Sequence, residues 1–179
     1  LKPFEFRYLK STNGDVLVAR MGFTADLGYE FWMTPQQCTA FKAQIDAARQ
    51  ELSLIIPGYG LSALEACRLE GGFVVAGWDF ATELDPEPGF ERTPFETGLG
   101  WLVDLDGPDF VGREALSALR TNSRYLIRRI STDATGSLVG IPLIANVNNQ
   151  VVTIGSVNCS ARSWGLNTTI GNASVDPAF

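Results

Sequence analysis

The sequence of 179 residues contains no histidine. Histidine is the side chain that most often acts as a general base near neutral pH, activates a serine or cysteine nucleophile, or binds a catalytic zinc ion. Its absence excludes these histidine-dependent sites from the sequence. Chemistry in this chain must therefore depend on carboxylates, arginines, aromatic side chains or a bound cofactor.

Cysteine and basic residues are also scarce. Cys38, Cys67 and Cys159 lie far apart with no C-x-x-C spacing, which argues against a zinc knuckle or a redox pair. We expect three buried, reduced thiols. Fourteen basic residues against twenty acidic ones give a formal charge of −6, the wrong sign for binding a phosphate backbone. Nucleic acid is not an expected partner.

Long hydrophobic runs are missing as well. No apolar stretch approaches the roughly 20 residues of a membrane helix, and the first ten residues, LKPFEFRYLK, lack the order of a signal peptide. We therefore expect a soluble, cytoplasmic protein with no membrane partner. An apolar content of 45% is enough for one large domain or two small ones.

The first third of the chain predicts strands and one long helix. Alternation over residues 4–9, followed by Asn13-Gly14 and residues 15–21, predicts a β-hairpin, and a third strand is expected over residues 29–33. The segment Thr34-Pro35-Gln36-Gln37 is typical of a capped helix start. The helix should extend to about Leu52 with one core-facing stripe. That stripe comprises Cys38, Phe41, Ile45, Ala48 and Leu52.

The middle of the chain predicts shorter elements. A helix is expected from Leu61 to Glu70, ended by Gly71-Gly72, and strands are expected over residues 73–76 and 98–105. The acidic, proline-rich residues 81–94 should form a solvent-facing loop, and a short helix should begin at Gly112.

From residue 123 onward the pattern changes to short β-rich runs and a tail of turn residues. The expected fold is α+β: an antiparallel sheet with flanking helices, followed by a small all-β, barrel-like domain. We place the domains at residues 1–122 and 123–179.

Four segments, read in order, resemble blocks of one family. "GFTADLGYE" (22–30), "GLSALEACRLEGG" (60–72), "TPFETGLGWLVDLDGPDFVGREAL" (93–116) and "IGSVNCSARSWGL" (154–166) are similar to blocks of the glycine-cleavage T-protein family. Its members are tetrahydrofolate-dependent aminomethyltransferases and folate-dependent demethylases. The resemblance implies the C-terminal part of a transferase that moves a methyl or aminomethyl group from a small donor to folate. It also implies an N-terminal half or companion subunit that carries the catalytic aspartate, so no catalytic residue is assigned here.

The resemblance implies that Glu30 binds folate. It matches the family glutamate whose carboxylate accepts hydrogen bonds from the amino group and adjacent ring nitrogen of the pterin. A two-oxygen acceptor suits two neighbouring N–H donors on a flat heterocycle. On a strand, Glu30 and Trp32 share one face, whereas Tyr29 and Phe31 lie on the other. The alternative is a glutamate on the wet face of an edge strand, which the residues alone favour.

Three further residues are implied by the same resemblance. Phe23 takes the place of a family tyrosine and Trp101 that of a tryptophan near the folate; each either walls the pterin or packs in the core. Arg68 fits the second arginine of the family segment "GLxARDxLRLEAG", with an ion pair to Glu65 or Glu70 on the helix surface as the favoured alternative. Gly22 and Gly28 serve the turn before Glu30.

One departure from the family is informative. Leu64 stands where T-proteins carry the arginine that engages the glutamate tail of folate, and leucine cannot replace a guanidinium. The chain therefore looks closer to the demethylase branches. A non-catalytic folate-binding subunit and a degenerate structural relative remain alternatives. No metal site is expected, because the aspartates at 104, 106 and 109 are typical of a solvated strand end.

Overall fold

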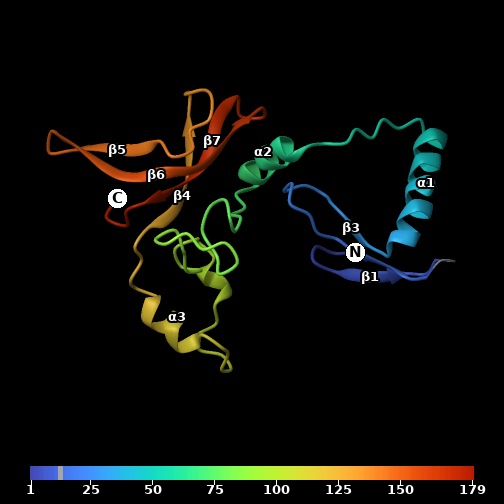
Figure 1. The fold of residues 1–179 in the computed structure, drawn as a ribbon, viewed down its shortest axis with the longest axis horizontal. Helices are drawn as coiled ribbons and strands as arrows, with labels where there is room; N and C mark the ends of the chain where they lie inside the picture. Colours follow the sequence, from blue (N-terminus) through green and yellow to red (C-terminus); the bar gives the residue numbers. More distant parts are fainter. Residues whose placement is uncertain (12–13) are drawn as a thin grey trace. The chain divides into compact units, whose positions relative to one another are not determined.

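The computed structural model describes residues 1–11 and 14–179, which divide into two compact units, Leu1–Gly71 and Gly72–Phe179 (Figure 1). Both units contain antiparallel sheet, and helices lie in both, which confirms the α+β class. The predicted boundary at residue 122 lies within the second unit and stays a prediction. Among the described residues, no helix has the length and apolar character to cross a membrane.

The first unit opens with a three-stranded antiparallel sheet in the order β1-β2-β3. Its strands are β1 (Phe6–Leu9), β2 (Val16–Ala19) and β3 (Glu30–Trp32). The predicted hairpin is confirmed in its two strands, but Asn13 of its predicted turn lies outside the described residues. The central strand is the buried one: Val16, Val18 and Ala19 are each 6% exposed. β3 is therefore an edge strand, supported on one side by β2.

Helix α1 (Pro35–Glu51) begins as the sequence predicts. The Gln37 backbone N–H donates to Thr34 Oγ1, and the Thr34 N–H donates to Gln37 Oε1, forming the capping box. The predicted core-facing stripe is wrong except at the half-buried Phe41, because α1 meets the sheet only near its start. Gln37 is buried there and donates to the carbonyl of Asp15 at 3.2 Å, and Phe41 packs on Phe31 at 4.6 Å between ring centroids.

The thiol prediction is also partly wrong. Cys159 is buried, but Cys67 is half-buried, and Cys38 is exposed on the uncovered face of α1. All three are free thiols. The exposure of Cys38 has the same cause, the limited contact between α1 and the sheet.

Helix α2 (Leu61–Gly71) matches its prediction, and Gly72 ends it in the left-handed region at φ +78°. The strand predicted over residues 73–76 is wrong. Asp79 turns the chain there: its backbone N–H donates to the carbonyl of Val75, and its carboxylate accepts from the Val75 N–H at 2.7 Å. These two contacts close a turn where periodicity alone indicated an extended strand.

The strand predicted over residues 98–105 is wrong too. Gly98 is left-handed at φ +79°, and the N–H of Leu99 donates back to the carbonyl of Pro94 at 2.8 Å. The chain then forms η1 (Gly100–Leu102), a short 3₁₀ helix. Helix α3 (Arg113–Leu119) follows after Gly112, as expected.

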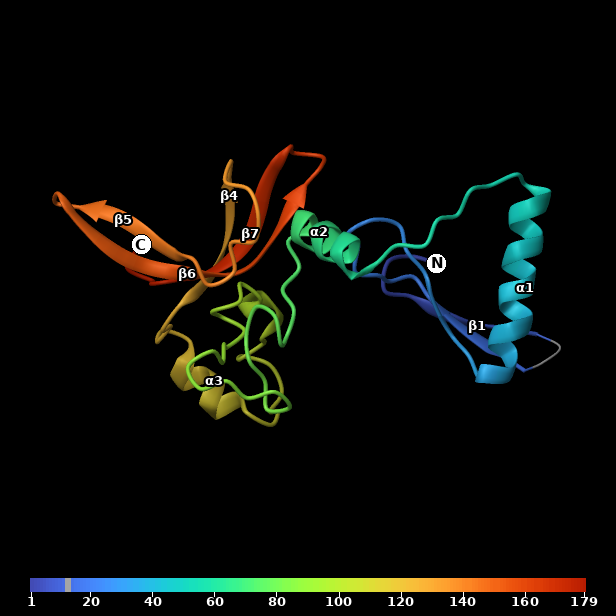
Figure 2. The same ribbon diagram turned by 45° about the horizontal axis from the view of Figure 1, so that its top comes forward.

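The second unit ends in a four-stranded antiparallel sheet of order β4-β7-β6-β5. Its strands are β4 (Leu126–Thr132), β5 (Pro142–Val147), β6 (Gln150–Ser163) and β7 (Thr168–Val175). The first half of β6 pairs with β5 and its second half with β7, so β5 and β6 form an arm that extends beyond β4 (Figures 1 and 2). The barrel-like closure stays a prediction.

β7 replaces the predicted tail of turn residues. It is the most buried strand, and most of its side chains are small or polar, so it lacks the hydrophobic alternation of a typical strand. Gly171 allows its backbone to lie against the carbonyl of Cys159 on β6, where a Cβ atom would clash. Polar side chains on this strand find partners instead of water: Asn172 Nδ2 donates to Asp79 Oδ1 at 2.9 Å.

Candidate functional site

A tight turn sets the position of Glu30 at the start of β3. A Cβ atom at Gly28 would lie 3.2 Å from the carbonyl of Met21 and 3.6 Å from the Cα of Gly22. The two glycines therefore serve a close approach of backbone, as the sequence predicts, and the turn between them contains Ala25 at φ +61°. The chain then enters β3 with Glu30 opposite Ala19 of β2.

The alternation of β3 separates Glu30 from the helix-covered face. Phe31 lies opposite the buried Val18 and packs on α1, so Glu30 and Trp32 project from the other face of the edge strand. Glu30 is half-buried, whereas Trp32 is 63% exposed. The structure thus places a carboxylate beside an open aromatic side chain.

The Glu30 carboxylate has no partner among the described residues. Over residues 1–11 and 14–179, neither a hydrogen-bond donor nor a lysine or arginine pairs with it. Half-buried carboxylates are normally satisfied by such partners or by water. Glu30 is therefore available to two donors of an incoming ligand.

Phe23 lies inside the same turn, one residue after Gly22, and is 39% exposed. Gly22 and Gly28 lie against each other and bring the two arms of the turn together. Phe23 follows Gly22 on one arm, and Glu30 lies two residues after Gly28 on the other. Trp101 lies in the second unit on η1, and not on a strand as expected, with 79% of its surface exposed. Its role as a pterin wall stays a prediction.

Arg68 is held by Glu65 on α2. Its Nε and Nη2 atoms donate to the two carboxylate oxygens of Glu65 at 2.8 and 2.6 Å, a bidentate pair. The ion pair weighed as the alternative to folate contact is thus present. It is not on the helix surface, because the side chain of Arg68 is 0% exposed and that of Glu65 is 17% exposed.

The sequence did not single out Glu96, which organises the start of the second sheet. Its carboxylate, 1% exposed, accepts from the backbone N–H groups of Thr93 and Arg124 at 2.8 Å each and of Tyr125 at 3.5 Å. Burial by itself would raise the pKa of Glu96, but these hydrogen bonds outweigh burial and hold the pKa below its usual value. The segment Thr93-x-x-Glu96 has the spacing of a capping box and was the available signal.

The aspartates at 104 and 106 lie in a turn, and not at the end of a strand as expected. The carboxylate of Asp104 accepts from the N–H groups of Asp106 and Gly107 at 3.2 and 2.9 Å. This local use of the carboxylate is the Asx-turn pattern typical of such segments.

Comparison with known proteins gives consistent matches. The family model described as "GCVT N-terminal domain" matches residues 1–107. The chain is 35% identical over 180 residues to trimethylamine-oxide aldolase of Ruegeria pomeroyi, covering 97% of this chain and 21% of that protein. It is 33% identical over 116 residues to an aminomethyltransferase of Halothermothrix orenii, covering 65% of this chain and 30% of that protein.

A solved structure shares the fold. The crystal structure of glycine cleavage system aminomethyltransferase T from Bartonella henselae matches with a TM-score of 0.70 at 19% identity, covering 91% of this chain and 42% of that chain. The chain therefore spans less than half the length of each of these proteins.

Proposed function

Because the chain belongs to the family of the GCVT N-terminal domain, we propose that it is part of a tetrahydrofolate-dependent one-carbon transferase. The proposed reaction moves a methyl or aminomethyl group from a small donor to tetrahydrofolate. Several of the relatives are named aminomethyltransferases, which supports a transfer of this class. The catalytic aspartate is proposed to come from an N-terminal segment or a companion subunit.

The observation that carries this proposal is the unpartnered, half-buried carboxylate of Glu30 on the open edge of β3. The pterin of folate presents an amino group and an adjacent ring N–H on one edge. Two carboxylate oxygens match these two donors, and hydrogen bonds to an ionised acceptor are stronger than neutral ones. Glu30 thereby orients the ring. Orientation of two bound reactants supplies much of the rate of a group transfer.

The other residues have different support. Phe23 is proposed as an apolar contact for the ring, because it belongs to the turn that presents Glu30. Trp101 is proposed as a second aromatic contact on the resemblance alone. For Arg68, full burial and the bidentate pair with Glu65 favour a structural role within α2 over direct contact with folate.

The donor is proposed to be one used by a demethylase-like branch. Leu64 removes the arginine that would anchor the folate tail in a glycine-cleavage component. We place the protein in the cytoplasm, where its three free thiols stay reduced.

Calorimetric titration with tetrahydrofolate tests the site. Saturable binding is expected, and Glu30→Ala should weaken it by about tenfold to a hundredfold, the equivalent of the roughly 1.5 to 3 kcal/mol of hydrogen bonds to a charged group. The affinity of Glu30→Gln should lie between those of the unmodified protein and Glu30→Ala, because glutamine keeps one acceptor oxygen and loses the charge.

Glu51→Ala is the matched control, since Glu51 ends α1 in the same unit and is exposed. Its affinity for tetrahydrofolate should equal that of the unmodified protein. Equal affinity in Glu30→Ala, or no saturable binding by the unmodified protein, contradicts the proposal.

A further inference from the structure

A pocket lies within the second unit, apart from the residues proposed to bind folate. It is a pocket of about 380 Å³ between the loop at residues 89–92 and the strands β5, β6 and β7. Its lining combines one cation, one carboxylate, hydroxyl groups and apolar surface. The lining residues that matter here are Arg92, Tyr125, Ile154, Ser156, Ser174 and Asp176.

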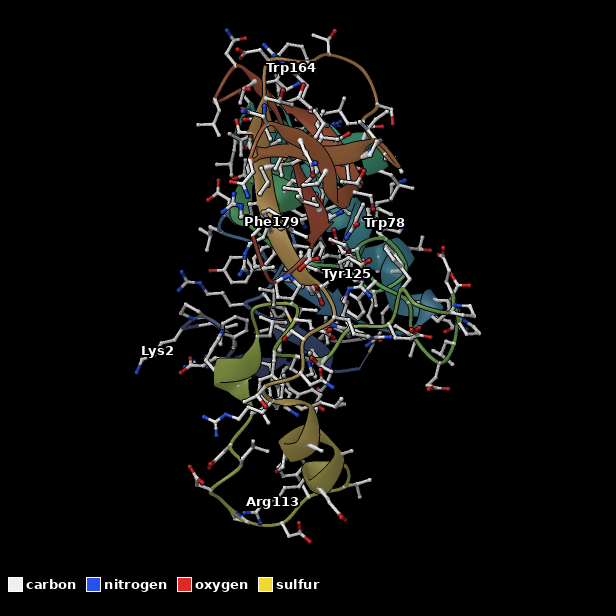
Figure 3. All side chains as sticks on the ribbon, turned by 90° about the vertical axis from the view of Figure 1, so that its left-hand side faces the viewer. Lys2, Trp78, Arg113, Tyr125, Trp164 and Phe179 are labelled. Atoms are coloured by element: carbon white, nitrogen blue, oxygen red, sulfur yellow. The ribbon has the colours of Figure 1, made fainter. Side chains whose placement is uncertain are left out.

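Arg92 is the cation of the pocket, and most of its donors are used. Nη1 donates to the carbonyls of Gly89 and Glu91 at 2.9 and 2.7 Å, and Nη2 donates to Ser174 Oγ at 2.9 Å. The guanidinium carbon lies 5.4 Å from the ring centroid of Phe90 and 5.2 Å from that of Tyr125, which is labelled in Figure 3. The charge is thus held in a fixed orientation between two aromatic rings.

One donor of Arg92 is unsatisfied. Its Nε atom is buried and has no acceptor among residues 1–11 and 14–179. A buried donor without a partner carries a desolvation cost that an acceptor would relieve. Burial also lowers the pKa of Arg92, in keeping with a guanidinium withdrawn from water, although Glu96 opposes this effect.

The unsatisfied Nε–H of Arg92 and the hydroxyl of Ser174 form a pair of donors suited to an oxyanion. Nε–H and Nη2 share one edge of the planar guanidinium, and Nη2 on that edge already donates to Ser174 Oγ. The hydroxyl hydrogen of Ser174 has no acceptor in the described part of the chain, so it is free to donate. Two donors side by side match the two oxygens of a carboxylate.

Asp176 limits the charge of the ligand. Its carboxylate is exposed, accepts only the N–H of Ala178 among the described side-chain contacts, and lines the same pocket. A second negative charge on the ligand would meet this carboxylate, and repulsion of that kind sets specificity. Tyr125 and Ile154 offer apolar surface to an uncharged remainder.

We propose that this pocket binds a small organic monocarboxylate, with its oxygens on Arg92 Nε and the Ser174 hydroxyl and its apolar part against Tyr125 and Ile154. Entry requires the ring of Phe90 or Tyr125, which cover the guanidinium, to rotate. The inference goes beyond the proposed function, because no residue proposed to bind folate contributes to it.

The test is an NMR titration of the protein with butyrate and with succinate, which have equal carbon number but one and two carboxylates. Butyrate should shift the amide signals of Gly155 and Ser156 to saturation with a Kd on the order of 1 mM, as expected for a ligand of this size. Succinate should bind at least about fivefold more weakly, because of its second charge. Asp176→Asn should remove most of that difference.

Arg92→Lys should weaken butyrate binding about tenfold or more, because lysine lacks the forked donors. Arg120→Lys, at an exposed arginine at the end of α3, should have no effect. If Arg92→Lys does not fold, Ser174→Ala provides the same comparison by removing one of the two donors. The proposal is overturned if the butyrate shifts do not saturate, if neither Arg92→Lys nor Ser174→Ala weakens them, or if succinate binds as tightly as butyrate.

Discussion

Replacing Asp79 with alanine is expected to lower the free energy of unfolding of the protein by about 3 kcal/mol. The Asp79 side chain is fully buried, and its carboxylate accepts from Val75 N–H, Asn172 Nδ2 and Cys159 Sγ at 2.7, 2.9 and 2.8 Å. Alanine leaves these three donors without their acceptor. Since two of them lie on β6 and β7, the loss should loosen the attachment of the loop at residues 75–81 to the sheet.

Urea unfolding followed by tryptophan fluorescence measures this change. Asp79→Asn should also destabilise the protein, because it offers one acceptor oxygen where the carboxylate offers two. Asp85→Asn is the control, since Asp85 is an exposed residue of the following loop and should stay within about 0.5 kcal/mol of the unmodified protein. A loss below about 1 kcal/mol in Asp79→Ala would show that water replaces the carboxylate and that the cluster does not hold the loop.

The second large effect is expected from Glu65→Ala, which should destabilise the protein by about 3 kcal/mol, the lower end for breaking a buried ion pair. The variant leaves the guanidinium of Arg68 at 0% exposure without the carboxylate that binds two of its nitrogens. Part of the cost should come from the buried charge that has lost its bidentate contact, and part from the lost attraction between the two side chains.

A double variant separates these two causes. Glu65→Leu combined with Arg68→Met should recover most of the stability, because apolar residues of similar volume often replace a buried pair without loss. Urea unfolding of both variants, with Glu51→Ala as the exposed control, gives the comparison. A double variant less stable than Glu65→Ala would mean that Arg68 stabilises the fold through its other contacts and not through Glu65.

Local signals in the sequence were sufficient for the helices of the first unit. Thr34, Pro35 and Gln37 form a cap whose hydrogen bonds lie within four residues, so α1 could be predicted to begin where it does. Where contacts between distant residues determine the local structure, the sequence predictions were wrong. Asp79 binds Cys159 and Asn172, which lie 80 and 93 positions further along the chain. No local pattern around Asp79 predicts either contact.

β7 shows the same limit in another form. Hydrophobic alternation was the signal for strands, but β7 is buried on both sides with small and polar residues and therefore lacks that signal. Residues 98–105 had alternation and still formed no strand, because the chain turns at the left-handed Gly98 and then forms η1. In residues 98–105 the hydrophobic alternation predicted a strand, but the backbone conformation at Gly98 determined the structure.

The candidate site divides in a similar way. The sequence identified Glu30 through the resemblance and placed Trp32 on its face, as the strand register agrees. It could not reveal that the carboxylate lacks a partner in the described residues, nor that Arg68 is buried against Glu65. Both properties depend on the packing of side chains, and the first of them carries the proposed function.

The most direct test of that function is a double-mutant cycle between Glu30 and the pterin amino group. Calorimetry would compare tetrahydrofolate with its 2-desamino analogue, using the unmodified protein and Glu30→Ala. If Glu30 accepts a hydrogen bond from the amino group, removing that group should weaken binding about tenfold in the unmodified protein and little in Glu30→Ala, a coupling of about 1 kcal/mol or more. An equal loss in both proteins would show that Glu30 does not bind the pterin amino group, and would contradict the central claim.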